Sequence, residues 1–314
     1  PPVMLESINW LNHGFIYRYL NKRNNRKQAA AIEKAMYNLN FNNPVLFIDN
    51  DFFNGLYLQD FLKLSCTVYY LRDFLLAQPY FSKHGVFSEP ELIKKVDLVV
   101  ANSLYLTSYA RQYNNNCFYI GQGCGDLFFK PVKTGAPADI QQIKPPIIGY
   151  CGFLTSARLD IKLLGDIAKA RPEWSLVLVG PEDDDFKNSD LHTLKNIFFM
   201  GRKNEPELPA YVSLFDVCLN PQLINQLTIG NYPRKVDEYL AMGKPVVATA
   251  TETMEAFAHC TYLCNGSEAY ISAIEKALAE DDAEKQKMRR DVAESHSWEN
   301  SINLFYNAVA AQHK

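Results

Sequence analysis

The stretch YPRKVDEYLAMGKPVVAT, residues 232–249, joins two kinds of structure and thereby indicates the fold. Val236, Tyr239 and Leu240 recur at helical spacing, and Gly243 follows them in the position where a glycine commonly ends a helix. The apolar run PVVAT comes next and has the length of a buried strand. This stretch is therefore predicted to be a helix that leads directly into a strand.

The first turn of this helix carries an unusual charge. Asn231 is predicted to cap the helix, and Pro233 suits its first turn. Arg234 and Lys235 then stand where the positive end of the helix dipole favours Asp or Glu, which costs up to about 1 kcal/mol. A bound anion would offset that cost. The alternative is a solvated basic patch, with Lys235 and Glu238 sharing one face of a core helix.

The same alternation of strand and helix extends through the chain. From residue 145 to about 290, apolar runs and amphipathic segments alternate, which predicts βαβ units and a doubly wound parallel sheet. The first 140 residues show four further strand signals, in NPVLFIDND, LSCTVYYLRD, VDLVVANS and NCFYIGQGCG. We predict an N-terminal domain over 1–140 and a C-terminal domain over 141–314 that ends in a final helix. Residues 134–146 are rich in Pro and Ala and are the best candidate for a linker.

Composition excludes several classes of protein. The 314 residues carry a net charge of -3, which argues against nucleic acid as a partner. No apolar run approaches the ~18 residues of a membrane span. The seven cysteines are odd in number and form no C-x-x-C pair, which indicates reduced thiols in a cytoplasmic protein. Cys260, Cys264 and His259 do not have a convincing zinc-site spacing, so no metal is expected.

A second glycine-containing turn follows the apolar run at 147–151. Gly149 and Gly152 form a G-x-x-G turn, and Arg158 lies six residues beyond the second glycine. Glycines after a strand let a ligand approach the backbone, and a nearby arginine suits an anion. A tight strand-to-helix turn explains the same pattern, so both interpretations stay open.

Several segments, taken in order, resemble a known family. They are GYCGFLTSARLDIKLL, SLVLVGP, NIFFMGRKNEPELPAYVSLFDVCLNP, YPRKVDEYLAMGKPVVAT and SHSWENSINLF. Together they resemble the donor-binding half of GT-B glycosyltransferases over residues 145–312, nearest to the retaining family 4 and its bacterial surface-polysaccharide enzymes. The resemblance implies an α/β fold of two Rossmann-like domains with an inter-domain cleft. It also implies that some 70 to 90 residues, about half a typical domain, are missing from the N-terminal domain.

The resemblance implies a role for particular residues. Arg158 and Lys235 would neutralise the charge that builds on a nucleoside-diphosphate leaving group, in place of a metal ion or other cofactor. Glu238 would lie near the ribose, and the backbone of 228–232 would hold the phosphates. The donor-binding set is Gly152, Gly180, Pro181, Gly201, Arg202, Thr228, Asn231, Tyr232 and Glu238.

Two positions depart from the family pattern, and one further residue is an acceptor-side candidate. A family glutamate that often contacts the donor sugar falls on Gly230, and an arginine falls on Phe153. Asp73, after the strand in LSCTVYYLRD, is the candidate for a catalytic residue facing the acceptor. An Asx turn after a strand is the alternative for Asp73, and it is the favoured one.

The resemblance implies a metal-independent, retaining glycosyltransferase that moves a hexose from UDP- or GDP-sugar to a glycan or lipid-linked acceptor. The alternative is a non-catalytic nucleotide-sugar-binding or scaffold protein of the same fold. The segment from Arg18 to Lys27 mixes basic and aromatic residues and predicts peripheral contact with the inner face of the membrane. A solvated helix face is the alternative there.

Overall fold

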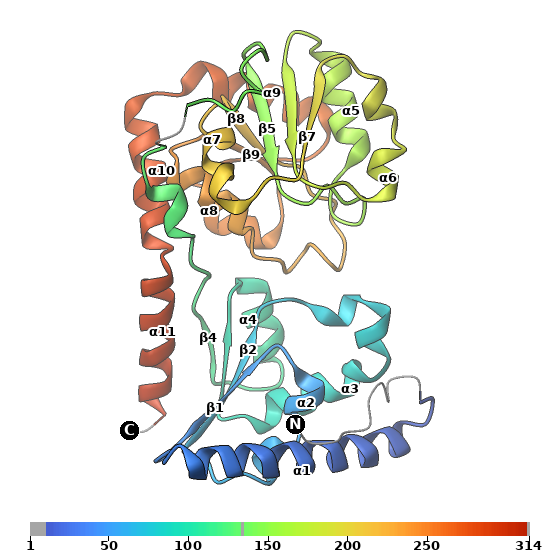
Figure 1. Ribbon diagram of the computed structural model, residues 1–314, viewed down its shortest axis with the longest axis vertical. Coiled ribbons are helices and arrows are strands. Elements are labelled where there is room, and N and C mark those ends of the chain that lie inside the picture. The colour runs from blue at the N-terminus through green and yellow to red at the C-terminus, as the bar shows by residue number, and fades with distance from the viewer. Residues whose placement is uncertain (1–10, 133–134, 313–314) are drawn as a thin grey trace. The chain divides into compact units, whose positions relative to one another are not determined.

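A computed structural model describes residues 11–132 and 135–312 of the protein. The chain separates into two compact units (Figure 1). Unit 1 holds the residues up to Gly121, the short segment Gly230–Tyr232 and the residues from Ile302 onward. Unit 2 holds Gln122–Ile229 and Pro233–Ser301. The first boundary therefore lies before the expected division at residue 140.

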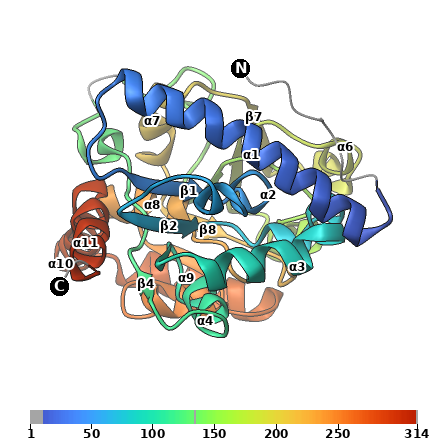
Figure 2. The ribbon, with the colours of Figure 1, turned by 90° about the horizontal axis from the view of Figure 1, so that it is seen from below.

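Unit 1 is built on a parallel sheet with the strand order β1-β2-β3-β4. The strands are β1 (Val45–Asp49), β2 (Cys66–Leu71), β3 (Leu98–Ala101) and β4 (Cys117–Tyr119), at the four predicted places. The helices are α1 (Gly14–Asn38), α2 (Phe52–Gly55), α3 (Pro79–Lys95) and α4 (Leu104–Arg111). Figure 2 shows α1 crossing this unit beside β1 and α2.

Both faces of the unit 1 sheet are buried. Tyr69 and Val99 pack on one face in a cluster with residues of α3 and α4. Val68 and Val100 pack on the other face with Ala308, which lies in the last helix, α11 (Trp298–Ala311). Alternate residues of each strand thus point to opposite faces, as a covered parallel sheet requires. This packing explains why the end of α11 belongs to unit 1, although the final helix was expected in the C-terminal domain.

Unit 2 contains a parallel sheet of six strands in the order β10-β9-β8-β5-β6-β7. The strands are β5 (Ile147–Cys151), β6 (Ser175–Val179), β7 (Ile197–Gly201), β8 (Val217–Asn220), β9 (Val246–Thr249) and β10 (Tyr262–Cys264). Its further helices are α5 (Ile161–Ala170), α6 (Asp184–Lys187), α7 (Leu208–Val212), α8 (Arg234–Ala241), α9 (Ser267–Glu280) and α10 (Ala283–Ser295). Every residue of β5, β6, β8 and β9 is buried, so the doubly wound fold is confirmed.

The strand order of unit 2 also locates its ligand-binding edge. β5 pairs with β6 on one side and with β8 on the other, so the order of the chain reverses at β5. In open parallel sheets, ligands bind outside the carboxyl ends of the strands at such a reversal. The loops after β5, β6 and β8 are therefore the first place to look for a site.

Three local expectations differ from the structure. β10 and α10 were not predicted from the sequence. The expected linker, of which residue 134 lies outside the described residues, is not structureless: the Asp139 carboxylate binds Lys203 Nζ at 2.7 Å and the Tyr211 hydroxyl at 2.9 Å. Asn231 does not cap α8; Pro233 occupies the N-cap and supplies no side-chain hydrogen bond.

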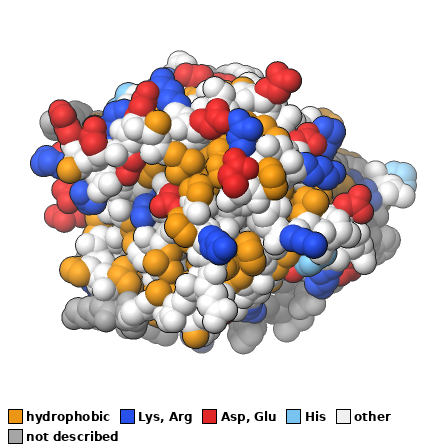
Figure 3. Space-filling view, turned by 90° about the horizontal axis from the view of Figure 1, so that it is seen from above, with side chains coloured by type: hydrophobic (Ala, Val, Ile, Leu, Met, Phe, Trp, Pro, Cys, Tyr) orange, Lys and Arg blue, Asp and Glu red, His pale blue; other side chains and the backbone are white. Residues whose placement is uncertain are grey.

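The surface agrees with the small net charge of the chain. Figure 3 shows Lys and Arg side chains interspersed with Asp and Glu on the face seen from above. Among the described helices, none combines the length and the apolarity that crossing a bilayer requires.

Candidate functional site

Three of the predicted glycines meet at the carboxyl edge of the unit 2 sheet. Gly152, Gly180 and Gly201 stand at the ends of the adjacent strands β5, β6 and β7. The amide of Gly152 donates to Val179 O at 2.8 Å, and that of Gly180 donates to Gly201 O at 3.0 Å. A Cβ atom on Gly180 would lie 1.8 Å from the carbonyl oxygen of Gly152. Only glycine permits this approach, so the ends of β5 and β6 pack backbone against backbone at the edge where such sheets bind their ligands.

Lys235 lies directly beside this edge. Its Nζ is 4.8 Å from the centroid of the Tyr150 ring, which places the ammonium over the ring face. A Cβ atom on Gly152 would lie 3.2 Å from Lys235 Cε, so a larger residue there would crowd the lysine. The structure therefore brings together Gly152 and Lys235, which are 83 positions apart by number. Tyr150, which orients the lysine, was not singled out from the sequence.

Helix α8, which carries Lys235, is fixed at several points. The hydroxyl of Tyr239 accepts a hydrogen bond from Cys151 N at 2.8 Å, which ties the helix to the end of β5. Asp237 is fully buried and contacts His296 Nδ1 at 2.8 Å. Gly243, with φ of 74°, ends the helix as predicted. The charged first turn is thus mounted on a rigid element, as a precise binding site requires.

Glu238 pairs with Arg234, and not with Lys235 as the spacing alone allowed. Arg234 Nε lies 2.9 Å from Glu238 Oε1, one helical turn away. The Glu238 side chain is 12% exposed, and this burial raises the pKa of its carboxyl, while Arg234 and Lys235 act in the opposite direction. Arg234 thus takes the carboxylate in an ion pair, while the Lys235 ammonium lies over the Tyr150 ring.

Arg158 and Thr228 belong to two loops that are hydrogen-bonded to each other. The carbonyl of Arg158 accepts from Leu223 N at 2.8 Å, and Asn225 Nδ2 donates to Ala157 O at 3.0 Å. The hydroxyl of Thr228 donates to Leu223 O and is buried. Asn225 Oδ1 also accepts from the backbone amides of Leu227 and Thr228, as in an Asx turn. The half-buried Arg158 is therefore backed by an ordered loop that the sequence did not indicate.

The predicted phosphate cradle is divided between the units. Thr228 lies in unit 2, whereas Gly230–Tyr232 lie in unit 1, with Tyr232 buried. The carbonyl of Gly230 accepts from Ser103 Oγ at 2.9 Å, and a Cβ atom on Gly230 would lie 2.6 Å from Tyr105 Cδ1. A glutamate here would require Tyr105 to move, so glycine at this position satisfies packing.

The remaining predicted residues also lie close to strand ends. Pro181 and Arg202 are exposed and follow the glycines that end β6 and β7. Asp73 follows β2 in unit 1, and its carbonyl accepts from Leu75 N at 2.9 Å. Asp183 caps the short helix α6 through Phe186 N at 2.9 Å, so the acidic run at 183–185 has a structural role. No group of three or more His, Cys, Asp or Glu suited to a metal ion occurs among the described residues.

Comparisons of the sequence with known proteins agree on one family. The family model of glycosyl transferases group 1 matches residues 145–280, which include the glycine edge and α8. The chain is 30% identical over 223 residues to TuaH of Bacillus subtilis (strain 168), a glycosyltransferase named for teichuronic acid biosynthesis. The match takes in 67% of this chain and 56% of TuaH. The chain therefore spans little more than half the length of this relative.

Solved structures show the same fold at low sequence identity. The crystal structure of Anabaena Alr3699/HepE in complex with UDP superposes with a TM-score of 0.72 at 16% identity, covering 90% of this chain and 81% of that one. Sucrose-phosphate synthase from Thermosynechococcus elongatus gives a TM-score of 0.71 at 18% identity, covering 92% and 79%. The GT-B fold, an α/β architecture with two parallel sheets, is thereby confirmed.

Proposed function

The chain belongs to the group 1 glycosyltransferases, and on that premise we propose that it binds a UDP-sugar at the carboxyl edge of the unit 2 sheet. It then transfers the sugar to a surface-polysaccharide acceptor. The observation that carries the proposal is the placement of the Lys235 ammonium beside the bare backbone of Gly152. A lysine ammonium beside a strand end that carries no side chain suits a diphosphate better than a neutral ligand.

The proposed mechanism follows from where charge develops. When the bond from the sugar to the diphosphate breaks, negative charge builds on the leaving phosphate oxygens. Lys235 would stabilise that charge directly, and the guanidinium of Arg158 would bind the same diphosphate. Such electrostatic stabilisation is usually the largest single contribution to catalysis. The reaction retains the configuration of the sugar and uses these side chains in place of a metal ion.

The other donor groups have narrower roles. The carboxyl of Glu238, held by Arg234, would accept hydrogen bonds from the ribose hydroxyls. The base would lie at the strand ends Gly180–Pro181 and Gly201–Arg202, where Pro181 and Arg202 are exposed. The Anabaena relative was crystallised with UDP and with UDP-glucose, which supports uridine as the base. The name of TuaH supports a glycan of the cell surface as the acceptor.

Hydrolysis and transfer assays test this function. We expect slow release of UDP from at least one UDP-sugar in a donor panel, and a loss of release of about 100-fold in Lys235→Ala. The matched control is Lys287→Ala, which removes an exposed lysine of α10 that pairs with Asp291 at the surface. No turnover with any donor, or equal turnover in both variants, would sink the enzymatic proposal.

A non-catalytic nucleotide-sugar-binding protein is the second candidate. The observation that favours it is Gly230, which stands against Tyr105 where the family has a glutamate. Both candidates predict that UDP stabilises the folded protein and so raises its melting temperature. At a UDP concentration of a hundred times Kd, the free energy of unfolding should rise by about 2.7 kcal/mol. Binding without turnover across the donor panel would select the second candidate.

The outer surface of α1 supports a further proposal, contact with an anionic membrane. Phe15 and Tyr19 are 84% and 65% exposed near the start of the helix. Arg18, Arg23 and Arg26 are exposed beside them. Each basic group near an anionic surface contributes about 1 kcal/mol. We expect the protein to co-sediment at low salt with vesicles that contain phosphatidylglycerol. The variant in which Arg18, Arg23 and Arg26 are all replaced by alanine should not co-sediment. Unaltered protein that stays in the supernatant would contradict this contact.

A further inference from the structure

Unit 1 contains an open groove that none of the donor chemistry uses. The groove has a volume of about 690 Å³ and lies where α1 ends and β1 and β2 begin. It is lined by Glu33, Met36, Tyr37, Asn40, Phe41, Asn42, Asn43, Pro44, Lys63, Leu64 and Ser65. These residues lie at the amino ends of the strands, so the length of β1, roughly 15 Å, separates them from the carboxyl edge that carries Asp73.

One wall of the groove is set by the way α1 ends. Asn40 has φ of 54°, and its amide donates to Tyr37 O at 3.2 Å, while Phe41 N donates to Met36 O at 3.0 Å. This pair of bonds is a Schellman motif, in which the left-handed position is usually glycine. Asparagine also tolerates that backbone. Here it adds an exposed amide side chain to the groove.

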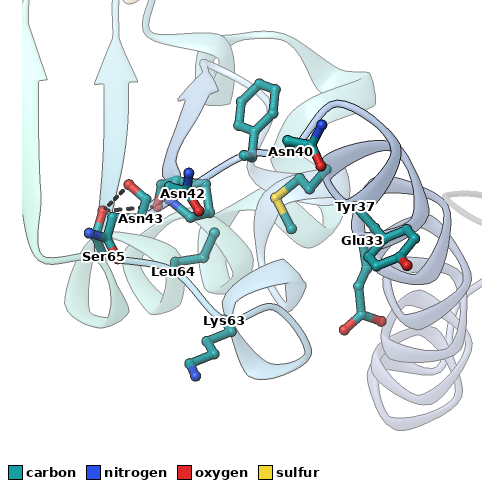
Figure 4. Close-up of a pocket in the computed structure, with 11 residues that line it drawn as sticks. Glu33, Tyr37, Asn40, Asn42, Asn43, Lys63, Leu64 and Ser65 are labelled. Atoms are coloured by element: carbon teal, nitrogen blue, oxygen red, sulfur yellow. Dashed lines mark hydrogen bonds between the residues drawn. The ribbon is translucent and has the colours of Figure 1, made fainter.

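The opposite wall is fixed by Ser65. Its hydroxyl donates to the carbonyls of Asn43 at 2.8 Å and Pro44 at 3.0 Å, as the dashed lines in Figure 4 show. Asn43, with φ of 49°, is a second left-handed asparagine. Figure 4 also shows Tyr37 and Glu33 on α1 across from Asn42 and Asn43. Hydrogen bonds to backbone carbonyls therefore shape both walls before any ligand arrives.

The side chains in the groove have a specific chemical character. Tyr37 is 84% exposed and Phe41 is 58% exposed, so each offers a free aromatic face to solvent. Three exposed asparagines, at 40, 42 and 43, each offer an amide that both donates and accepts. Sugar hydroxyls likewise both donate and accept, and the C–H face of a pyranose ring packs on an aromatic ring. Glu33 and Lys63 balance each other in charge, so the groove does not select an anion.

We propose that this groove binds an oligosaccharide, as a second glycan site apart from the site of transfer. Aromatic platforms beside amides fit a chain of pyranose rings, because the C–H faces pack on the aromatic rings and the hydroxyls pair with the amides. The proposal concerns unit 1 alone and does not require donor binding. A glycan bound here would keep a growing polymer attached between transfers and raise its local concentration.

Titration calorimetry with two tetrasaccharides, one of N-acetylglucosamine and one of galacturonate, tests the proposal. We expect binding of at least one of them with Kd on the order of 1 mM, as for a shallow site. Tyr37→Ala removes the more exposed aromatic face and should weaken binding about three- to tenfold. The matched control is Tyr19→Ala, the same substitution on the same helix five turns away, which should bind like the unaltered protein.

The outcomes separate this site from the donor site. UDP binding should be equal in the unaltered protein, Tyr37→Ala and Tyr19→Ala, because neither tyrosine of α1 belongs to the proposed donor site. Binding of neither tetrasaccharide, equal binding by Tyr37→Ala and the unaltered protein, or an equal loss in Tyr19→Ala would overturn the proposal. Both substituted side chains are largely exposed, so folding is expected to survive and circular dichroism checks it.

Discussion

Gly180 offers the sharpest test of the glycine edge in unit 2. In Gly180→Ala, the added Cβ would lie 1.8 Å from Gly152 O and 2.8 Å from Gly152 C. A carbon and a carbonyl oxygen approach to about 3.3 Å at closest, so the two strand ends must separate by more than about 1 Å. The alanine also has to adopt a φ of 148°, which residues other than glycine rarely do. We expect a loss of about 2–5 kcal/mol of stability from the two effects.

The same displacement should affect the ligand site. Lys235 packs beside Gly152, so separating the strand ends moves the backbone away from the ammonium. A misplacement of about 1 Å costs about 100-fold in rate at a preorganised site, so we expect turnover to fall by that factor and UDP binding to weaken. Urea unfolding measures the stability, and titration calorimetry with UDP measures the binding.

Gly266→Ala is the matched control for backbone strain. Gly266 has φ of 80° and lies after β10, but a Cβ atom there would meet nothing within 4 Å. It should lose only about 1–2 kcal/mol and bind UDP normally. Equal destabilisation of the two variants, or normal UDP binding by Gly180→Ala, would refute the argument from close approach.

Two further predictions concern buried ionisable groups. Glu89 is fully buried and accepts from the hydroxyls of Tyr69 and Tyr109, and burial raises the pKa of its carboxyl to about 7. The folded state therefore keeps a proton that the unfolded chain loses above about pH 4.5, so stability falls by about 1–3 kcal/mol as pH rises towards 7. The stability of Glu89→Gln, measured by urea unfolding, should not fall over this pH range. Parallel profiles of stability against pH for the variant and the unaltered protein would contradict this prediction. His296→Ala removes a contact of the buried Asp237 and should cost about 1–3 kcal/mol. An unchanged urea midpoint in that variant would show that the contact does not stabilise α8.

The strands of both units could be predicted because their signals are local. Apolar runs such as residues 175–179 are buried along their whole length, and a run of that kind is visible in the sequence. β10 covers only Tyr262–Cys264 and shows no such run. α10 has a strongly polar sequence and buries chiefly Arg289 and Ala293, so its apolar period is nearly absent. Its place is set by Arg289 Nη1, which donates to Gly243 O at 3.0 Å, a contact that no spacing reveals.

The candidate site was predictable in its residue types but not in its pairings. The basic first turn of α8 predicted an anion, but either Arg234 or Lys235 could have paired with Glu238. The sequence could not decide that Arg234 binds Glu238 while Lys235 lies over Tyr150, because that depends on the direction of each side chain. The capping prediction for Asn231 was wrong because the helix begins only at Arg234, with Pro233 as its N-cap, so Asn231 lies too far upstream. Asn225 was missed because an asparagine in a polar loop gives no signal of an Asx turn that braces Arg158.

The central claim is that Lys235 binds the diphosphate of the donor. Titration calorimetry of UDP against the unaltered protein, Lys235→Ala and the surface control Lys287→Ala tests it most directly. A hydrogen bond to a charged group contributes about 1.5–3 kcal/mol, so Lys235→Ala should weaken UDP binding by about 10- to 150-fold. Lys287→Ala should bind like the unaltered protein. UDP affinity that is unchanged in Lys235→Ala, or reduced equally in both variants, would contradict the account.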